Sequence, residues 1–170
     1  ILKAKGDLQQ AISAYKQALQ INDADHEVYS DLAAVLLEVG SYVDAISAAR
    51  NSLKIKSDVP YAFLNLGLAL RASGKLKSAT TAFKSATMKE PFLAEAFFQY
   101  GQCQYDLNNY KKAVNAFKKA IKIQPDMVEA YCNLGNALRL LGFFKECIDC
   151  LEKAIKMDPE KFEIYANLAI

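Results

Sequence analysis

Carboxamide and carboxylate side chains recur through this sequence at intervals of 34 residues. The series consists of Asp31, Asn65, Gln99, Asn133 and Asn167. A carboxamide offers one acceptor and two donors, so it can pair with both the carbonyl and the amide of an extended peptide backbone. Asn136 adds a second amide beside Asn133, although asparagine weakens helices. We interpret the series as a candidate ladder for a peptide backbone. The alternative is a polar surface that a repeated sequence tolerates.

Two cysteines have the spacing of redox and zinc motifs, Cys147 and Cys150. A zinc site would require further cysteines or histidines, and His26 is the single histidine of the chain. The sequence contains no glycine-rich phosphate loop and no recognisable pairing of a nucleophile with a base. We therefore expect no catalytic residues, no metal and no cofactor, and we do not expect this chain to be an enzyme.

The composition is that of a folded protein without a strong charge. Of the 170 residues 52% are hydrophobic and 24% are charged, which argues against disorder. A net charge of +2 is too small for the overall electrostatic footprint of a nucleic-acid binder. No apolar stretch is long enough to span a membrane. Four cysteines without a dense, regular framework predict reduced thiols and a cytoplasmic location.

A second series with the same interval identifies the elements that carry these side chains. The series is Gly6, Gly40, Gly74, Asn108 and Gly142, so that for example 74 − 40 = 34. Glycine, and next to it asparagine, tolerates the left-handed backbone region, so the series predicts a tight turn in each unit. Apolar residues between the turns follow helical spacing, which predicts a helical hairpin in each unit of 34 residues.

Prolines predict where the helices begin and end. Pro91, Pro125 and Pro159 are also 34 residues apart and should close the second helix of their hairpins. Asp58 followed by Pro60 predicts the start of a first helix, with the aspartate as the cap and the proline near the first helical position.

The pattern resembles the tetratricopeptide (TPR) repeat over essentially the whole chain. We number positions within a repeat so that the turn residue is position 15. Position 8 is then small in every repeat, because it lies where the two helices of a hairpin approach closely; its residues are Ala33, Gly67, Gly101, Gly135 and Ala169. The resemblance implies an all-α fold, a right-handed superhelical solenoid of 34-residue helix-turn-helix repeats.

The register predicts a single TPR solenoid over residues 1–170. It consists of a partial repeat (1–25), full repeats at 26–59, 60–93, 94–127 and 128–161, and a second partial repeat (162–170). Because each repeat buries its core against its neighbours, we expect these residues to be a segment of a longer solenoid. The alternatives are fraying at both ends, or helices exchanged between molecules.

The resemblance also implies that the first helices line the concave surface of the solenoid. We call the face formed by positions 2, 6, 9 and 13, flanked by 5 and 12, the inner face. The candidate peptide-binding residues on it are Asn65, Gln99, Asn133, Asn136, Asn167, Arg71, Arg139, Tyr61, Phe98 and Tyr105. The two arginines could receive an acidic or phosphorylated side chain, or they could be solvated or paired with a glutamate. The aromatic residues would add apolar area.

Two comparisons with known TPR proteins refine the expected ligand. The asparagines resemble the inner ladder in the TPR arm of O-linked N-acetylglucosamine transferases; Asn65, Asn133 and Asn167 match it, whereas Asp31 and Gln99 depart from it. The carboxylate clamp that binds chaperone tails requires lysine at position 5, and this sequence lacks it. Position 5 is Ser30, Leu64, Phe98, Cys132 and Ala166.

We therefore expect a non-catalytic protein–protein interaction module that binds an extended peptide or partner segment in its groove. One alternative is the substrate-recognition arm of a larger enzyme, such as a protein glycosyltransferase. Another is a structural scaffold that self-associates through its open ends or outer faces. A run of lysines from Lys111 to Lys122 should lie on the outer face, where we interpret it as a solvated surface.

Overall fold

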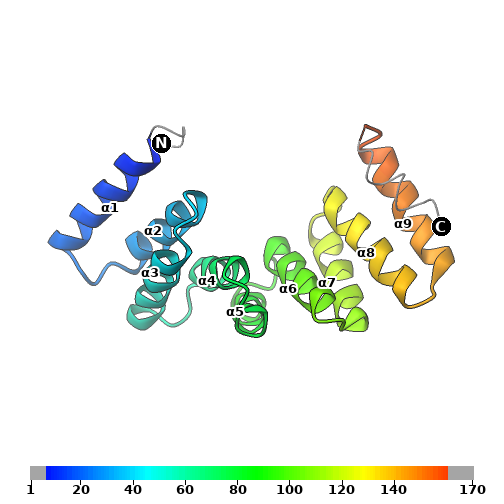
Figure 1. The fold of residues 1–170 in the computed structure, drawn as a ribbon, viewed down its shortest axis with the longest axis horizontal. Coiled ribbons are helices and arrows are strands. Elements are labelled where there is room, and N and C mark those ends of the chain that lie inside the picture. The colour runs from blue at the N-terminus through cyan, green and yellow to red at the C-terminus, as the bar shows by residue number, and fades with distance from the viewer. Residues whose placement is uncertain (1–6, 161–170) are drawn as a thin grey trace. The chain divides into compact units, whose positions relative to one another are not determined.

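The computed structural model describes residues 7–160, which form nine α-helices and no strand (Figure 1). The helices are α1 (Leu8–Ile21), α2 (His26–Glu38), α3 (Tyr42–Ile55), α4 (Pro60–Ala72), α5 (Leu76–Lys89), α6 (Ala94–Asp106), α7 (Tyr110–Ile123), α8 (Val128–Leu140) and α9 (Phe144–Met157). Helices α2 to α9 pair as four consecutive hairpins. The chain divides into two compact units, unit 1 ending at Pro91 and unit 2 beginning at Phe92.

The turn of each hairpin has the predicted left-handed backbone. Gly40, Gly74 and Gly142 have φ angles of 76°, 73° and 80°, and Asn108 has a φ of 60°. Asn108 is the one described residue other than glycine with a positive φ. Its Oδ1 atom accepts a hydrogen bond of 2.6 Å from the hydroxyl of Tyr110. The substitution of asparagine for glycine in this series therefore preserves the turn.

The second helices end where the prolines predict. Helices α5, α7 and α9 each stop two residues before a proline, namely Pro91, Pro125 and Pro159. However, α1 and α3 end at the same register without a proline. The residues after them, Asn22 and Lys56, adopt extended backbone with φ angles of −138° and −137°. Proline thus reinforces an end that the repeat also forms without it.

The prediction for the start of α4 is half right. Pro60 is the first residue of the helix, as expected, but Asp58 does not cap it. The residue that directly precedes the helix is Val59, which has no side-chain acceptor, so the predicted aspartate cap is wrong by one position. In α2 the cap position is held by Asp25, whose Oδ1 accepts from the backbone amides of Glu27 and Val28 at 3.0 and 3.1 Å.

Small residues let the two helices of a hairpin touch, as predicted for position 8. A Cβ atom added to Gly67 would lie 2.5 Å from Cε1 of Phe83, and one added to Gly101 would lie 2.6 Å from Cε1 of Phe117. The first full repeat instead has alanine at both corresponding positions, Ala33 and Ala49, and both are completely buried. Within residues 7–160, no helix combines the length and the apolar character needed to cross a membrane.

Candidate functional site

In unit 1 the inner face is formed by α2 and α4, which contact each other directly. Two hollows open along this pair of helices. The N-terminal hollow, at the start of both helices, has a volume of about 350 Å³. The C-terminal hollow, at their ends, has a volume of about 580 Å³. Both are lined by residues at inner-face positions, so the predicted face is a surface with depressions at its two ends.

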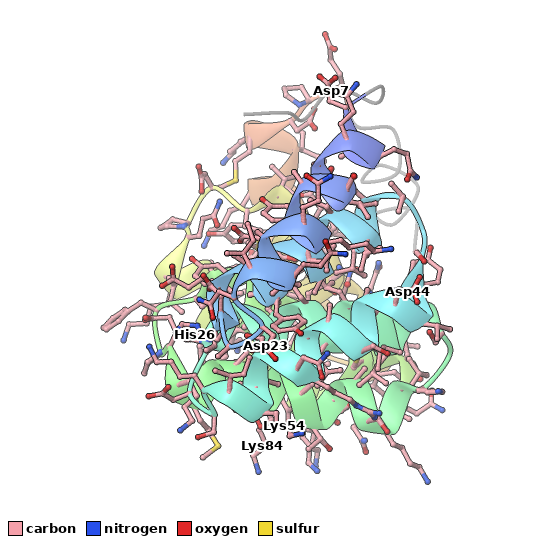
Figure 2. All side chains as sticks on the ribbon, turned by 90° about the vertical axis from the view of Figure 1, so that its left-hand side faces the viewer. Asp7, Asp23, His26, Asp44, Lys54 and Lys84 are labelled. Carbon is pink, nitrogen blue, oxygen red and sulfur yellow. The ribbon has the colours of Figure 1, made fainter. Side chains whose placement is uncertain are left out.

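The N-terminal hollow is polar and carries several charges. Its lining includes Glu27 and Asp31 from α2, Lys56 and Asp58 from the loop that follows α3, and Tyr61 from α4. His26, at the start of α2, also lines it and is labelled in Figure 2. The side chain of Tyr61, one of the predicted binding residues, is 59% exposed. It is therefore available to a ligand.

The C-terminal hollow is lined by apolar and charged residues together. Leu37, Leu68 and Ala72 supply its apolar atoms, while Glu38 and Arg71 supply its charges. Arg71 is half-buried here, which places this predicted binding residue on a depression of the inner face. In unit 2 the corresponding residue, Arg139, is exposed.

Asn65 lies between the two hollows but is directed into the protein. It is only 9% exposed, and its Nδ2 donates a hydrogen bond of 3.0 Å to the backbone carbonyl oxygen of Ser30 in α2. One donor of this carboxamide therefore joins α4 to α2. The structure thus gives Asn65 a bond between neighbouring repeats, and its role toward a ligand stays a prediction.

The carboxamides of unit 2 differ from one another in their surroundings. Gln99 is half-buried, and its Nε2 donates a hydrogen bond of 2.7 Å to Oε1 of Glu95. Asn133 is also half-buried. The Oδ1 atom of Asn136 is fully buried and accepts no hydrogen bond from any described residue. Asn167 lies outside the described residues.

Two predicted aromatic residues belong mainly to the packing of unit 2. Phe98 is only 8% exposed and its ring centre lies 5.9 Å from that of Phe117, so it is part of the core and does not offer open surface. The cause is its position, since position 5 is also buried in unit 1, at Ser30 and Leu64. Tyr105 is half-buried and meets Tyr110 edge-on, with ring centres 5.4 Å apart.

The predicted binding residues did not include the acidic residues that line both hollows, although Asp31 belongs to the predicted polar series and Asp58 was interpreted as a helix cap. These residues are Glu27, Asp31, Asp58 and Glu38. Their signal was present, because glutamate at position 2 and aspartate at position 6 were visible in the register. The Asp31 carboxylate also acts on α1. Burial, and to a smaller extent this carboxylate, raise the pKa of Tyr15.

The cysteines are packing residues in this structure. Cys147 is completely buried at a position where the other repeats have alanine, and Cys150 is half-buried one turn later. Burial raises the pKa of both thiols, so both stay protonated at neutral pH. Among residues 7–160, no three histidine, cysteine, aspartate or glutamate side chains are grouped as they would be to hold a metal ion.

The sequence matches profiles of a known repeat family. Profiles of the TPR repeat match residues 1–40 and 101–142, and a profile of the tetratricopeptide repeat matches residues 128–161. No curated protein matches the chain in sequence.

Several solved structures have a similar fold. The crystal structure of MamA is 26% identical, with a TM-score of 0.84 over 94% of this chain and 93% of MamA. YrrB, described as a TPR protein with an unusual peptide-binding site, is 21% identical, with a TM-score of 0.82 over 97% of this chain and 85% of YrrB. MamA from Desulfovibrio magneticus RS-1, from residue 41 to its end, is 18% identical, with a TM-score of 0.82 over 93% of this chain and 89% of that one. The fold is thus an all-α repeat solenoid, and since the matched profiles together cover more than half of the sequence, this chain belongs to the tetratricopeptide repeat family.

Proposed function

We propose that this chain is a non-catalytic protein-interaction module that binds an extended segment of a partner protein on its inner face. The observation that carries the proposal is the pair of hollows on α2 and α4, one at each end of the same two helices. A helix of 13 residues such as α4 is about 20 Å long. A fully extended peptide covers this distance with about six residues.

Some residues of the inner face contact the ligand in this proposal, and others hold the two helices in place. Tyr61 contacts the ligand at the N-terminal hollow, since its side chain is 59% exposed there. Leu68 and Ala72 contribute apolar lining to the C-terminal hollow. Asn65 fixes α4 against α2 through its bond to Ser30 and so maintains the spacing of the two helices. Unit 2, taken by itself, offers the half-buried carboxamide of Asn133, which can pair with a peptide backbone.

A peptide is also the ligand described for YrrB, which has the same fold. For the present chain, the exposed aromatic residue and the two depressions support the proposal independently of that likeness.

Site-specific photocrosslinking tests the proposal. Tyr61 is replaced by the photoreactive analogue p-benzoylphenylalanine, and the control protein carries the same analogue in place of Met88. Met88 is 71% exposed on α5, a second helix, so both replacements tolerate the larger side chain. Circular dichroism establishes that both proteins fold. Each is then irradiated in a cell lysate, and the adducts are identified by mass spectrometry.

We expect the protein with the analogue at residue 61 to capture a short recurring segment of one partner, and the control to capture none. Adducts of equal yield and identity from both positions would overturn the proposal. Adducts at residue 61 that consist of a second copy of this chain would instead establish a self-associating scaffold.

A further inference from the structure

The N-terminal hollow holds more negative than positive charge. Three carboxylates line it, those of Glu27, Asp31 and Asp58, against the ammonium group of Lys56 and the imidazole of His26. None of the three carboxylates forms an ion pair with any residue between 7 and 160. No described basic side chain therefore lies within ion-pair distance of these carboxylates.

The acidic character continues along α2. This helix carries Glu27, Asp31 and Glu38 and contains no lysine or arginine. The positive ends of the α2 and α4 dipoles point toward the N-terminal hollow, but each is equivalent to only about half a charge and Asp25 already caps one of them. The three carboxylates exceed the single ammonium group of Lys56 and these two partial charges together, so the hollow keeps a net negative charge. The hollow therefore attracts a cation.

The other groups of the hollow suit a long basic side chain. The exposed ring of Tyr61 offers a face to a cation, and carboxylates accept paired hydrogen bonds from a guanidinium group. Val59 and Pro60 line the same hollow and provide apolar surface for the methylene stem. A volume of about 350 Å³ has room for one such side chain.

The C-terminal hollow indicates a second property of the ligand. Three of its lining residues, Leu37, Leu68 and Ala72, are apolar and suit an apolar side chain. We infer that the inner face of unit 1 binds an extended segment that presents an arginine or lysine to the N-terminal hollow and an apolar residue to the C-terminal hollow. The inference rests on the proposed function and names the class of peptide. It differs from the expectation that Arg71 and Arg139 receive an acidic side chain.

Synthetic peptides with one varied residue test the inference. The probes place residue X and a leucine about six residues apart, joined by alternating serine and alanine, with X as arginine, glutamine or glutamate. The chain is labelled with ¹⁵N, and binding is followed by amide chemical shifts in NMR titrations, which detect weak complexes. We expect the arginine peptide to bind about tenfold more tightly than the glutamine peptide, with shifts on α2 and α4, and the glutamate peptide to bind least. Raising the ionic strength should weaken the arginine peptide most.

Two variants with the same change in net charge provide the control. Glu27→Gln/Asp31→Asn removes two carboxylates of the inner face, whereas Asp149→Asn/Glu152→Gln removes two exposed carboxylates of α9. The first variant should lose the preference for arginine over glutamine, and the second should keep it. Spectra of the free proteins show whether both remain folded.

The outcomes separate this inference from the proposed function. If the arginine and glutamine peptides bind equally and shift α2 and α4, or if the glutamate peptide binds best, the inference fails while the proposed function stands. If no peptide shifts α2 or α4, the inference fails, and the crosslinking yield at residue 61 decides on the proposed function. An equal loss of arginine preference in both variants would show a general charge effect and would also overturn the inference.

Discussion

Two asparagines at the same position of the repeat have different roles in this protein. Asn65 is buried and bonded to the carbonyl of Ser30 in the neighbouring repeat, whereas Asn133 is half-buried and makes no comparable bond within residues 7–160. A helical position offers little reason for asparagine, because alanine is favoured there by up to about 0.7 kcal/mol. The hydrogen bond between repeats explains Asn65 without any ligand.

Alanine substitutions should separate these roles. Asn65→Ala removes this hydrogen bond, worth about 0.5–1.5 kcal/mol, and the packing of a buried side chain, partly offset by helix propensity; the Ser30 carbonyl keeps its backbone bond within α2. We expect the free energy of unfolding to fall by about 1–2 kcal/mol for Asn65→Ala and to change by less than about 0.5 kcal/mol for Asn133→Ala. Urea unfolding followed by circular dichroism measures both values. Equal losses would contradict the distinction, and Asn133→Ala is accordingly the safer variant for studies of binding.

The buried thiols give the stability of the protein a dependence on alkaline pH. Burial raises the pKa of Cys147 and Cys150 in the folded state above the unfolded value of about 8.5. Above that pH the unfolded chain releases thiol protons that the folded chain retains. Their contribution to stability is therefore fully present below the unfolded pKa and is lost as the pH rises through the folded pKa.

We expect the wild-type protein to lose more stability between neutral and alkaline pH than the variant Cys147→Ala/Cys150→Ala. Alanine occupies both positions in the other full repeats, so the variant should fold. Urea unfolding of both proteins at a series of pH values measures the difference, in which the titration of tyrosine and lysine cancels. Parallel pH profiles would exclude a contribution from the thiols.

At the scale of the helical hairpin, the residues at positions 8 and 24 are matched in size. In the second full repeat these two residues are Gly67 and Phe83, and the glycine faces the phenyl ring. In the first full repeat they are Ala33 and Ala49. A phenylalanine ring at position 24 fits only when the residue at position 8 has no Cβ atom. An alanine at position 24 leaves room for the methyl group of an alanine at position 8. Each combination fills the space between two helices in its own way.

A double-mutant cycle tests this matching. Gly67→Ala places a Cβ atom 2.5 Å from a ring carbon of Phe83, and overpacking of this kind costs about 1–3 kcal/mol. In the background of Phe83→Ala, which itself costs about 3–5 kcal/mol, the same change should be neutral or should stabilise by up to about 1 kcal/mol through helix propensity. Unfolding free energies of the four proteins give the coupling. Additive effects would refute the matching of the two positions.

The hairpins also show which features a single sequence can predict. The turns, the ends of the second helices and the small residue at position 8 depend on local backbone requirements or on contacts within one hairpin, and their 34-residue recurrence revealed them. The burial of Asn65 and Phe98 depends on how neighbouring first helices pack, which periodicity does not reveal. The cap of α4 was misplaced because Asp58 is one residue too early to reach the first amides.

On the scale of the whole molecule, charge is distributed unevenly between first and second helices. The chain has a net charge of only +2, yet α5 contains three lysines and α7 contains five, and neither helix contains an acidic residue. Lys84 of α5, labelled in Figure 2, projects outward at the lower edge of that view. In α7, Lys118 pairs with Glu146 at 3.3 Å and Lys119 lies 5.3 Å from the ring centre of Phe97. The other lysines of α7, Lys111, Lys112 and Lys122, are exposed.

This distribution should decide how the protein interacts with a polyanion. At physiological ionic strength a charge acts over about 8 Å, so retention on heparin depends on local clusters of charge more than on net charge. We expect Lys111→Gln/Lys112→Gln/Lys122→Gln to elute from a heparin column at clearly lower salt than wild type. The matched control, Lys145→Gln/Lys153→Gln/Lys156→Gln on α9, removes the same charge from a helix that also carries Glu146, Asp149 and Glu152, and it should elute close to wild type. Equal shifts for both variants would mean that only net charge matters, and the lysines of α7 would then be an ordinary solvated surface.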